Sequence, residues 1–383
     1  MRTSRTRQTQ GDAITSRPIA GASHASSCYF RTTVPDGQRK ALVQITEKCN
    51  LRCAHCFVSA TQYGDTMTMN DLEDKVVPRL AVAGVTRVTL TGGEPFAHPD
   101  PLGVIQLFQT AGMSVGVCTN ATLTSDKHIE ALAAMPGVHV NVSLDGFAAD
   151  SHGKFRGDRA SFAITVDTVR RFAAAGLLQG LLCTPNRLAE VTEYEQLCAF
   201  AVECGAQYVL MNPLSSMGRG AKAKKALATA DAVMSDIAAR TAPFAGQLEL
   251  VNIRFPNEAG LPLAGCEAGR IIYVFTSGEV TACPYLVFAA RTAVSRHDPG
   301  EFIVGNIYTD PDIGQRLDAY NLHDRYRVGA NSTCSACSME QRCGKGCPAA
   351  VVAVGGRIGD LDAEQCPVTA GRVPAGRLLP VVP

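Results

Sequence analysis

Residues 49–56 read CNLRCAHC and come shortly after the apolar run ALVQI at residues 41–45. Cysteine sulfur is the usual protein ligand of iron–sulfur clusters, and three thiolates at this spacing can hold three corners of a cubic four-iron cluster. A structural zinc ion would need four ligands in a closed tetrahedron, and no fourth cysteine lies close enough in the sequence to complete one. The stretch therefore predicts a four-iron cluster whose remaining iron has no protein ligand.

Cys49, Cys53 and Cys56 have the spacing C-x3-C-x2-C, and the ring of His55 comes just before the last cysteine. In this respect the sequence resembles the radical S-adenosylmethionine (SAM) superfamily. The resemblance implies a [4Fe-4S] cluster whose open iron chelates the amino and carboxylate groups of SAM. The reduced cluster would pass one electron to the sulfonium, leaving methionine and a 5'-deoxyadenosyl radical that takes a hydrogen atom from the substrate. A reactive or metal-holding loop of another kind is the alternative.

The composition sets outer bounds on the class of protein. The 383 residues suffice for one barrel-sized domain and a smaller one. Charged residues make up 19% and the formal net charge is +1, so nothing indicates binding to nucleic acid. The chain has 15 cysteines and no export signal, which favours metal ligands in a reducing compartment, and we expect a cytoplasmic protein. We expect no membrane span, because no run of eighteen apolar residues is present.

Residues 1–35 differ in character from the rest of the chain. They contain several arginines among Ser, Thr and Gln, and Asp12 is the only acid before Asp36. The pattern superficially resembles a transit peptide, but the apolar face that such a peptide needs is weak. We expect a disordered or partner-binding arm. Cys28 is the one residue of this arm that the pattern leaves unexplained.

Short β-branched apolar runs alternate with helical patterns over residues 36–235. Such alternation is typical of parallel strands joined by helical crossovers. The expected strands are at residues 42–46, 87–91, 114–118, 138–144, 178–184 and 208–211. The predicted fold is α/β, a partial (β/α)6 barrel, which the family resemblance also implies. Residues 236–383 would form a bridging region and a small cysteine-rich auxiliary-cluster domain.

One glycine-rich motif follows the second predicted strand. It consists of Gly92, Gly93, Glu94 and Pro95, and the carboxyl ends of parallel strands are where ligand-binding groups gather. The two glycines allow the backbone to approach a ligand closely. In the family that the chain resembles, this motif binds the methionine amino group of SAM. We expect Glu94 to be structural to the site and to act more through its backbone than its carboxylate; a plain turn is the alternative.

Further candidate residues follow the third and fourth strands. Asn120 lies in a Thr-Asn-Ala-Thr segment similar to the family's Thr-Asn-Gly turn, with Ala121 in place of glycine. Ser143 and Asp145 resemble the family's Ser-Leu-Asp-Gly stretch, which implies hydrogen bonds to the ribose hydroxyls; a capping or turn aspartate is the alternative. Arg156 would clamp the methionyl carboxylate, since a guanidinium matches a carboxylate bidentately; a surface arginine is nearly as good an explanation.

A second group of cysteines occupies the C-terminal region. Its members are Cys266, Cys283, Cys334, Cys337, Cys343, Cys347 and Cys366. This order resembles the SPASM extension of radical SAM enzymes, which implies two auxiliary [4Fe-4S] clusters. Seven cysteines cannot complete two such clusters, which need eight ligands, so one site must be incomplete. A zinc ion bound by the cysteines of residues 334–347 is the alternative.

The family pattern also implies how these cysteines divide between the two clusters. One cluster would be held by Cys334, Cys337, Cys343 and Cys366. The other would be held by Cys266, Cys283 and Cys347. Its fourth ligand could be water, a substrate group or a side chain such as Cys28, and the sequence does not choose among them.

Three functions remain open at this point. The first is a ribosomal peptide maturase that crosslinks, oxidises or epimerises residues, its leader peptide recognised by the arm, the barrel or a separate leader-binding protein. The second is radical chemistry on a small molecule in cofactor, tetrapyrrole or natural-product biosynthesis, where a Gly-Arg-Gly like that of residues 218–220 also occurs. The third is a zinc-bearing binding protein. Either enzyme would need an electron donor such as flavodoxin or ferredoxin, and no general acid or base can be named.

Overall fold

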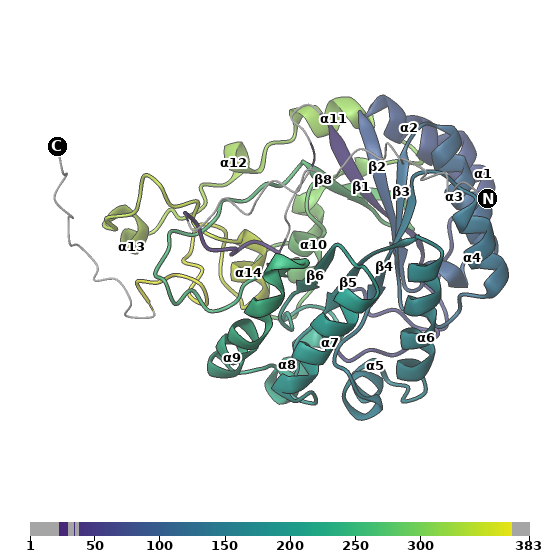
Figure 1. Ribbon diagram of the computed structural model, residues 1–383. Coiled ribbons are helices and arrows are strands. Elements are labelled where there is room, and N and C mark those ends of the chain that lie inside the picture. Colours follow the sequence, from purple (N-terminus) through teal and green to yellow (C-terminus); the bar gives the residue numbers. More distant parts are fainter. Residues whose placement is uncertain (1–22, 30–33, 35–37, 370–383) are drawn as a thin grey trace, which may run out of the picture.

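A computed structural model of the chain describes residues 23–29, 34 and 38–369 (Figure 1). Its central feature is a ten-stranded sheet in the order β10-β9-β8-β1-β2-β3-β4-β5-β6-β7. Every pairing from β8 through β1 to β7 is parallel, whereas β9 and β10 pair antiparallel.

The strands are β1 (Arg39–Thr46), β2 (Val85–Gly92), β3 (Ser114–Thr119), β4 (Val138–Ser143), β5 (Leu178–Cys183), β6 (Tyr208–Met211), β7 (Glu249–Asn252), β8 (Ile271–Val274), β9 (Glu279–Thr281) and β10 (Ile303–Asn306). The α-helices are α1 (Met69–Asp71), α2 (Val77–Val82), α3 (Pro101–Thr110), α4 (Asp126–Ala133), α5 (Lys154–Arg156), α6 (Ser161–Ala174), α7 (Val191–Glu203), α8 (Arg219–Leu227), α9 (Asp231–Thr241), α10 (Pro284–Ala290), α11 (Ile313–Ala319), α12 (Leu322–Arg325), α13 (Ser332–Ser335) and α14 (Pro348–Ala353). Short 3-10 or π segments are η1 (Leu72–Val76), η2 (Pro95–Ala97), η3 (Ala149–Gly153), η4 (Ala242–Gly246) and η5 (Pro299–Phe302).

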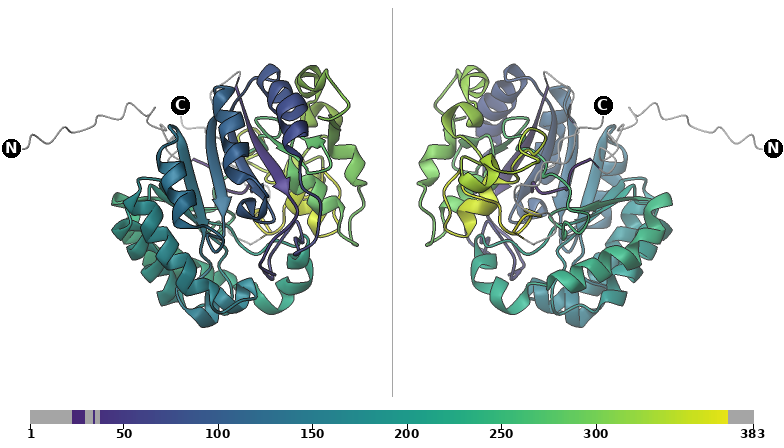
Figure 2. Two further views of the ribbon diagram at one scale, coloured as in Figure 1. Left: turned by 90° about the vertical axis from the view of Figure 1, so that its right-hand side faces the viewer. Right: turned by 90° about the vertical axis from the view of Figure 1, so that its left-hand side faces the viewer.

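The six predicted strands are confirmed as β1 to β6. In β1, Ala41, Val43 and Ile45 are completely buried, and the other strands add Val, Leu and Ile side chains to the same core. Near-continuous apolar strands are typical of parallel sheets covered on both faces. The crossover helices lie along the outer side of the curved sheet (Figure 2). No helix within the described residues is long and apolar enough to cross a membrane.

The sheet continues beyond residue 235, where the sequence suggested that the barrel ends. β7 extends the parallel sheet from β6, and β8 pairs in parallel with β1 on the opposite side. Both strands come from the part of the chain that was expected to be a bridging region. The barrel and the cysteine-rich region therefore share strands of one sheet.

Residues 23–29 differ from the expected disordered arm. The Ala25 N–H donates to Pro262 O at 2.9 Å, and Cys28 and Tyr29 are buried. In Figure 1 this purple segment lies among the green and yellow segments of the C-terminal region. Apolar and aromatic side chains in the segment 23–29 can offset the entropy of ordering, which the arginine-rich composition of residues 1–35 obscured. Residues 1–22, 30–33 and 35 of that arm lie outside the described residues.

The carboxyl ends of β1 and β2 are joined by hydrogen bonds between their loops. The Gly93 N–H donates to Thr46 O, and the Glu94 N–H donates to Lys48 O, each at 2.8 Å. The two loops pass so closely that a methyl group at Gly93 would lie 2.3 Å from Lys48 O. The glycines of the Gly-Gly-Glu-Pro motif therefore serve this close backbone contact next to the cysteine loop.

We predict that Gly93→Ala destabilises the protein by about 2 kcal/mol, because the new methyl group must displace backbone atoms and not a flexible side chain. Gly246→Ala is the matched control, since a methyl group there would meet no atom within 4 Å. Denaturant unfolding of both variants measures the difference. Equal stability of the two would contradict the close contact.

Candidate active site and cysteine clusters

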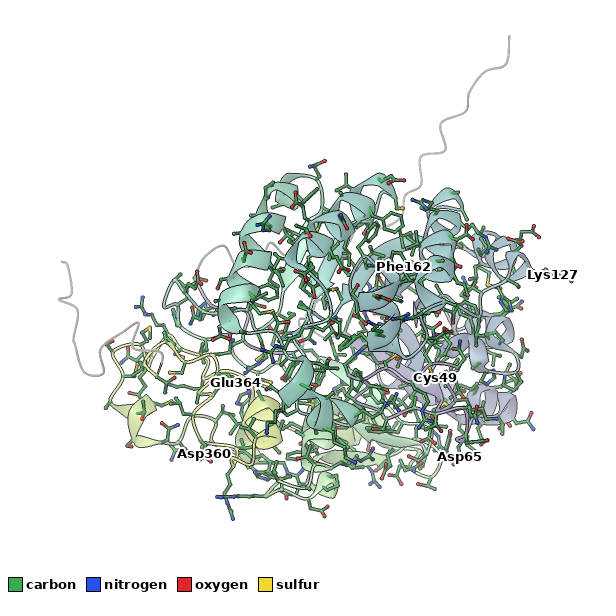
Figure 3. The ribbon with its side chains drawn as sticks, turned by 90° about the horizontal axis from the view of Figure 1, so that it is seen from below. Cys49, Asp65, Lys127, Phe162, Asp360 and Glu364 are labelled. Carbon is green, nitrogen blue, oxygen red and sulfur yellow. The ribbon has the colours of Figure 1, made fainter. Side chains whose placement is uncertain are left out.

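The predicted cluster loop lies at the carboxyl end of β1, with Cys49 near the middle of the view in Figure 3. Cys49 and Cys53 are buried, and Cys56 is half-buried. The loop is held from the other side of the site by the Ala54 N–H, which donates to Phe155 O at 2.8 Å. A cavity with an empty volume of about 520 Å³ opens beside Cys49. The three predicted iron ligands thus share one loop at the edge where the parallel strands end.

Gly218 and Arg219 contact this loop through hydrogen bonds and a close backbone approach. The Arg219 Nε–H donates to Cys53 O at 2.8 Å, and the Arg219 N–H donates to Cys56 O at 3.0 Å. Gly218 has φ +52°, and a methyl group on it would lie 2.4 Å from Phe57 O. The sequence associated this Gly-Arg-Gly only with a class of enzymes. Its position after the sixth strand, at the same edge as the cysteines, was the available signal for a role in the site.

Asp145 and Arg156 form a buried ion pair beside Cys53. Arg156 Nε and Nη2 each lie 2.8 Å from Asp145 Oδ2, and the Thr184 N–H donates to Asp145 Oδ1 at 2.7 Å. Burial acts to raise the pKa of Asp145, but the guanidinium and the hydrogen bonds outweigh it, so the pKa is lowered. Arg156 Nη1 also lies 3.9 Å from Cys53 Sγ. The two residues were predicted to bind different parts of SAM, and here they bind each other; their roles toward SAM stay predictions.

His55 presents a neutral ring at the same place. It stacks on Phe155 with 4.6 Å between ring centroids, and its Nε2 lies 3.7 Å from Asp145 Oδ2. Burial lowers the pKa of His55 to about 4. Its Nδ1 is buried and has no hydrogen-bond partner among the described residues. A buried nitrogen without a hydrogen-bond partner is costly, and a bound ligand that hydrogen-bonds to it would remove this cost.

Glu94 connects two of the predicted motifs through its carboxylate. It accepts hydrogen bonds from Thr119 Oγ1 at 2.6 Å, from the Asn120 N–H at 2.7 Å and from the Phe96 N–H at 3.2 Å. Burial raises the pKa of Glu94, which these donors oppose. The carboxylate is therefore fully used in holding the turn after β3 against the turn after β2, with Pro95 starting η2. In the structure the Glu94 carboxylate, more than its backbone, joins the two turns; the role of Glu94 toward SAM stays a prediction.

The turn after β3 reaches the cluster loop directly. Asn120 Nδ2 donates to Asn50 Oδ1 at 3.1 Å and lies 4.0 Å from Cys49 Sγ. Ala121, which stands where the family has glycine, has φ +65°; this left-handed conformation costs a non-glycine residue about 1–2 kcal/mol. The departure from the family pattern is therefore strained but keeps the turn. Ser143 lies at the end of β4, on the same edge of the sheet.

One C-terminal cavity gathers four cysteines that are far apart in sequence. Its empty volume is about 370 Å³ and its lining is largely apolar. The cysteines that line it are Cys334, Cys337, Cys343 and Cys366. This is the set that the family resemblance implied for one auxiliary cluster, including the distant last cysteine.

The remaining three cysteines of the C-terminal group also lie together. Burial raises the pKa of Cys266 to about 12, and the nearby Cys347 contributes to the rise. Burial, Cys266 and Cys347 likewise raise the pKa of Cys283. The structure adds a fourth sulfur here, because Cys347 lies close enough to raise the pKa of the Cys28 thiol.

Several of the sulfurs receive backbone hydrogen bonds. Main-chain N–H groups lie 3.4 Å from the Sγ atoms of Cys49, Cys337 and Cys343, the last receiving two. Such donors favour the thiolate form that iron requires. Among the described residues, no three His, Cys, Asp or Glu side chains are close enough to hold a single metal ion.

We predict that Arg156→Ala lowers the free energy of unfolding by about 3–5 kcal/mol, because it leaves the Asp145 carboxylate buried without its cation. Arg159→Ala is the control: Arg159 pairs with Asp150 at 3.0 Å, but both are largely exposed, and such pairs contribute about 1 kcal/mol or less. Denaturant titrations of the iron-free, reduced proteins give both values. Similar small losses in the two variants would show that the buried pair does not carry this weight.

The chain is similar in sequence to one family of enzymes and to several known proteins. Residues 43–185 match the Radical SAM superfamily. The mycofactocin maturase MftC of Mycobacterium ulcerans is 27% identical over 320 residues, covering 80% of this chain and 82% of the relative. The subtilosin biosynthesis protein AlbA of Bacillus subtilis is 26% identical, covering 70% of this chain and 57% of AlbA. An AdoMet-dependent heme synthase of Methanosarcina barkeri is 30% identical over 180 residues, covering 46% of this chain and 51% of the synthase.

Solved structures share the fold at low sequence identity. Streptococcus suis SuiB bound to its precursor peptide SuiA superposes with a TM-score of 0.68 at 16% identity, covering 86% of this chain and 76% of SuiB. The enzyme anSMEcpe with bound AdoMet superposes with a TM-score of 0.60 at 16% identity, covering 84% of this chain and 93% of that chain. The match over residues 43–185 shows that this chain carries a radical SAM domain, and the solved structures share its fold, a partial barrel followed by a C-terminal region that is rich in cysteines in this chain.

Proposed function

We propose that this enzyme is a peptide maturase that abstracts a hydrogen atom from a residue of a peptide or protein, leading to a crosslink, an oxidation or an epimerisation. The observation that carries the proposal is the extent of similarity to the maturases, which covers 80% of this chain for MftC and so reaches beyond the barrel. The similarity to the heme synthase covers 46%. A barrel shared by both groups does not separate peptides from small molecules, whereas the remaining part of the chain does.

Membership of the superfamily implies a [4Fe-4S] cluster and SAM. When bound, the reduced cluster supplies the electron that splits SAM into methionine and a 5'-deoxyadenosyl radical. We assign its iron ligands to Cys49, Cys53 and Cys56. Arg219 fixes the peptide units of two of these cysteines, and Arg156 places a positive charge 3.9 Å from Cys53 Sγ. Both arginines act to lower the pKa of the buried Cys53 thiol, which burial raises.

The residues around the loop would position SAM. The candidates are Gly92, Gly93, Glu94, Pro95, Asn120, Ser143, Asp145 and Arg156. The contacts suggest a division of labour among them. Glu94 and the Asp145–Arg156 pair hold the walls, since their polar atoms are already paired. Backbone groups of the turns, Ser143 and the free nitrogen of His55 would then be left to meet the nucleoside and the methionyl group.

We further propose two auxiliary [4Fe-4S] clusters, one in each C-terminal group of cysteines. A substrate radical must lose or gain an electron before it becomes product, and a neighbouring cluster can accept that electron. Hydrogen bonds to sulfur, such as the two that reach Cys343 Sγ, tune the potential of such a cluster. An external donor such as flavodoxin or ferredoxin would reduce the cluster that meets SAM.

We predict that Cys53→Ala abolishes formation of 5'-deoxyadenosine under reducing conditions, because it removes a ligand of the cluster that meets SAM. Cys334→Ala should keep that activity and lose product formation, because it removes a ligand of an auxiliary cluster. Cys198→Ala, which changes a buried cysteine of α7 far from both groups in the sequence, should keep both activities. Chromatography of 5'-deoxyadenosine from reconstituted enzyme is the measurement. Retention of that product in Cys53→Ala would contradict the ligand assignment.

We predict that a deuterated candidate precursor peptide, incubated with the enzyme and SAM, transfers deuterium into 5'-deoxyadenosine. Direct transfer is expected because the radical takes its hydrogen atom from the substrate carbon. Mass spectrometry of the nucleoside and the peptide reads out both partners. Transfer from a small molecule but from none of the candidate peptides would favour the small-molecule alternative, for which the heme synthase similarity speaks.

A further inference from the structure

The Cys28 thiol lies against the backbone of two predicted iron ligands. Its Sγ is 3.2 Å from Gly265 O and 3.5 Å from Gly346 O. These carbonyl groups belong to the residues directly before Cys266 and Cys347. Cys347 is also close enough to the Cys28 thiol to raise its pKa. Cys28 is therefore placed where the incomplete set of C-terminal cysteines needs another sulfur.

The segment that carries Cys28 is held on both sides of this residue. On one side, the Ala25 N–H donates to Pro262 O at 2.9 Å and the Ala264 N–H donates to Ala25 O at 3.1 Å. On the other side, the ring of Tyr29 stacks on Tyr285 with 4.8 Å between centroids. Tyr285 follows Cys283 by two residues. The contacts on either side thus lead to the chain next to Cys266 and Cys283.

The buried Arg254 connects the segment 23–29 to Cys347, another of the predicted ligands. Arg254 Nη1 lies 2.7 Å from Ser27 O and 2.7 Å from Asp362 Oδ2, and Nη2 lies 2.9 Å from Asp362 Oδ1. The same carboxylate accepts a hydrogen bond from the Cys347 N–H at 3.0 Å. Both side chains of the ion pair are almost completely buried. Such a pair is costly unless it is fully bonded, and here it fixes Ser27 and Cys347 relative to each other.

We propose that Cys28 is the fourth protein ligand of the auxiliary cluster held by Cys266, Cys283 and Cys347. Without iron, its thiol donates to neighbouring carbonyl groups; on ligation the proton leaves to solvent and the thiolate sulfur bonds to iron, with no change of oxidation state. The inference rests on the proposed auxiliary cluster and goes beyond it. Four protein thiolates leave no iron open to substrate, so this cluster serves electron transfer or structure and does not bind the peptide.

The experiment isolates the auxiliary clusters in a full-length background that lacks Cys49, Cys53 and Cys56. In that background, Cys28→Ser and Cys28→Ala are compared with Cys198→Ala, which also changes a buried cysteine. Each protein is reconstituted anaerobically, and its iron, its sulfide and the electron paramagnetic resonance spectrum of the reduced clusters are measured with and without cyanide, which binds an open iron.

With Cys28 present, cyanide should leave the spectrum unchanged. Cys28→Ser should keep the iron but alter the signal of one cluster, because oxygen replaces sulfur. Cys28→Ala should make that cluster sensitive to cyanide or lose its iron alone, while Cys198→Ala behaves as the parent. Cyanide sensitivity with Cys28 present, or spectra unchanged in both Cys28 variants, would overturn the assignment. A parent without this cluster would overturn the auxiliary cluster itself, and the inference with it.

Discussion

Cysteine sulfur must be anionic to bind iron, but the candidate ligands Cys49 and Cys53 are buried. The groups around each sulfur therefore have to offset the cost of burying its charge. Burial raises the pKa of Cys49 to about 12 and of Cys53 to about 11, so neither thiol would ionise near neutral pH without help. Metal, guanidinium groups and backbone N–H donors are what lower that cost. The strands supply the position, but the surroundings of each sulfur decide whether a cluster can be held there.

A buried arginine lies close to a predicted cysteine ligand at two places in the structure, and each arginine is paired with a buried aspartate. At the loop after β1, Arg156 reaches Cys53 while its other nitrogens bind Asp145. In the C-terminal region, Arg254 binds Asp362, which in turn accepts from the Cys347 N–H. In each case a buried carboxylate holds the guanidinium in place, because an unpaired charge of either sign would be costly there. The ion pairs therefore act as fixtures for cysteine ligands rather than as sources of net stability.

The sheet links the cluster loop to the cysteine-rich part of the chain. β8 lies beside β1, so the strand that leads into the cluster loop pairs with a strand from the cysteine-rich part of the chain. Ala25, in the first segment described, exchanges backbone hydrogen bonds with Pro262 and Ala264, and Cys28 and Tyr29 belong to an apolar cluster that also includes Met217. Two parts that the sequence presents as separate domains are thus built as one layer, which keeps the cysteine groups at fixed positions relative to one another.

Much of this could be predicted from the sequence, for reasons that particular residues make clear. The strands β1 to β6 could be predicted from local apolar runs. The grouping of Cys366 with Cys334 around one cavity was implied by the order of cysteines in the family that the chain resembles. Contacts set by tertiary structure could not be predicted. Nothing near Arg254 indicates Asp362, more than 100 residues later, and nothing near Cys28 indicates Gly265. Asp145 and Arg156 were read as separate ligand contacts because their spacing does not reveal that they face each other.

The central claim is that the cluster at Cys49, Cys53 and Cys56 keeps one iron for SAM. Mössbauer spectroscopy of iron-57-reconstituted protein, recorded before and after addition of SAM, tests it most directly. The account predicts that a single iron site of one cluster changes its isomer shift when the amino and carboxylate groups bind, while the auxiliary clusters do not respond. Spectra that are identical with and without SAM would contradict it.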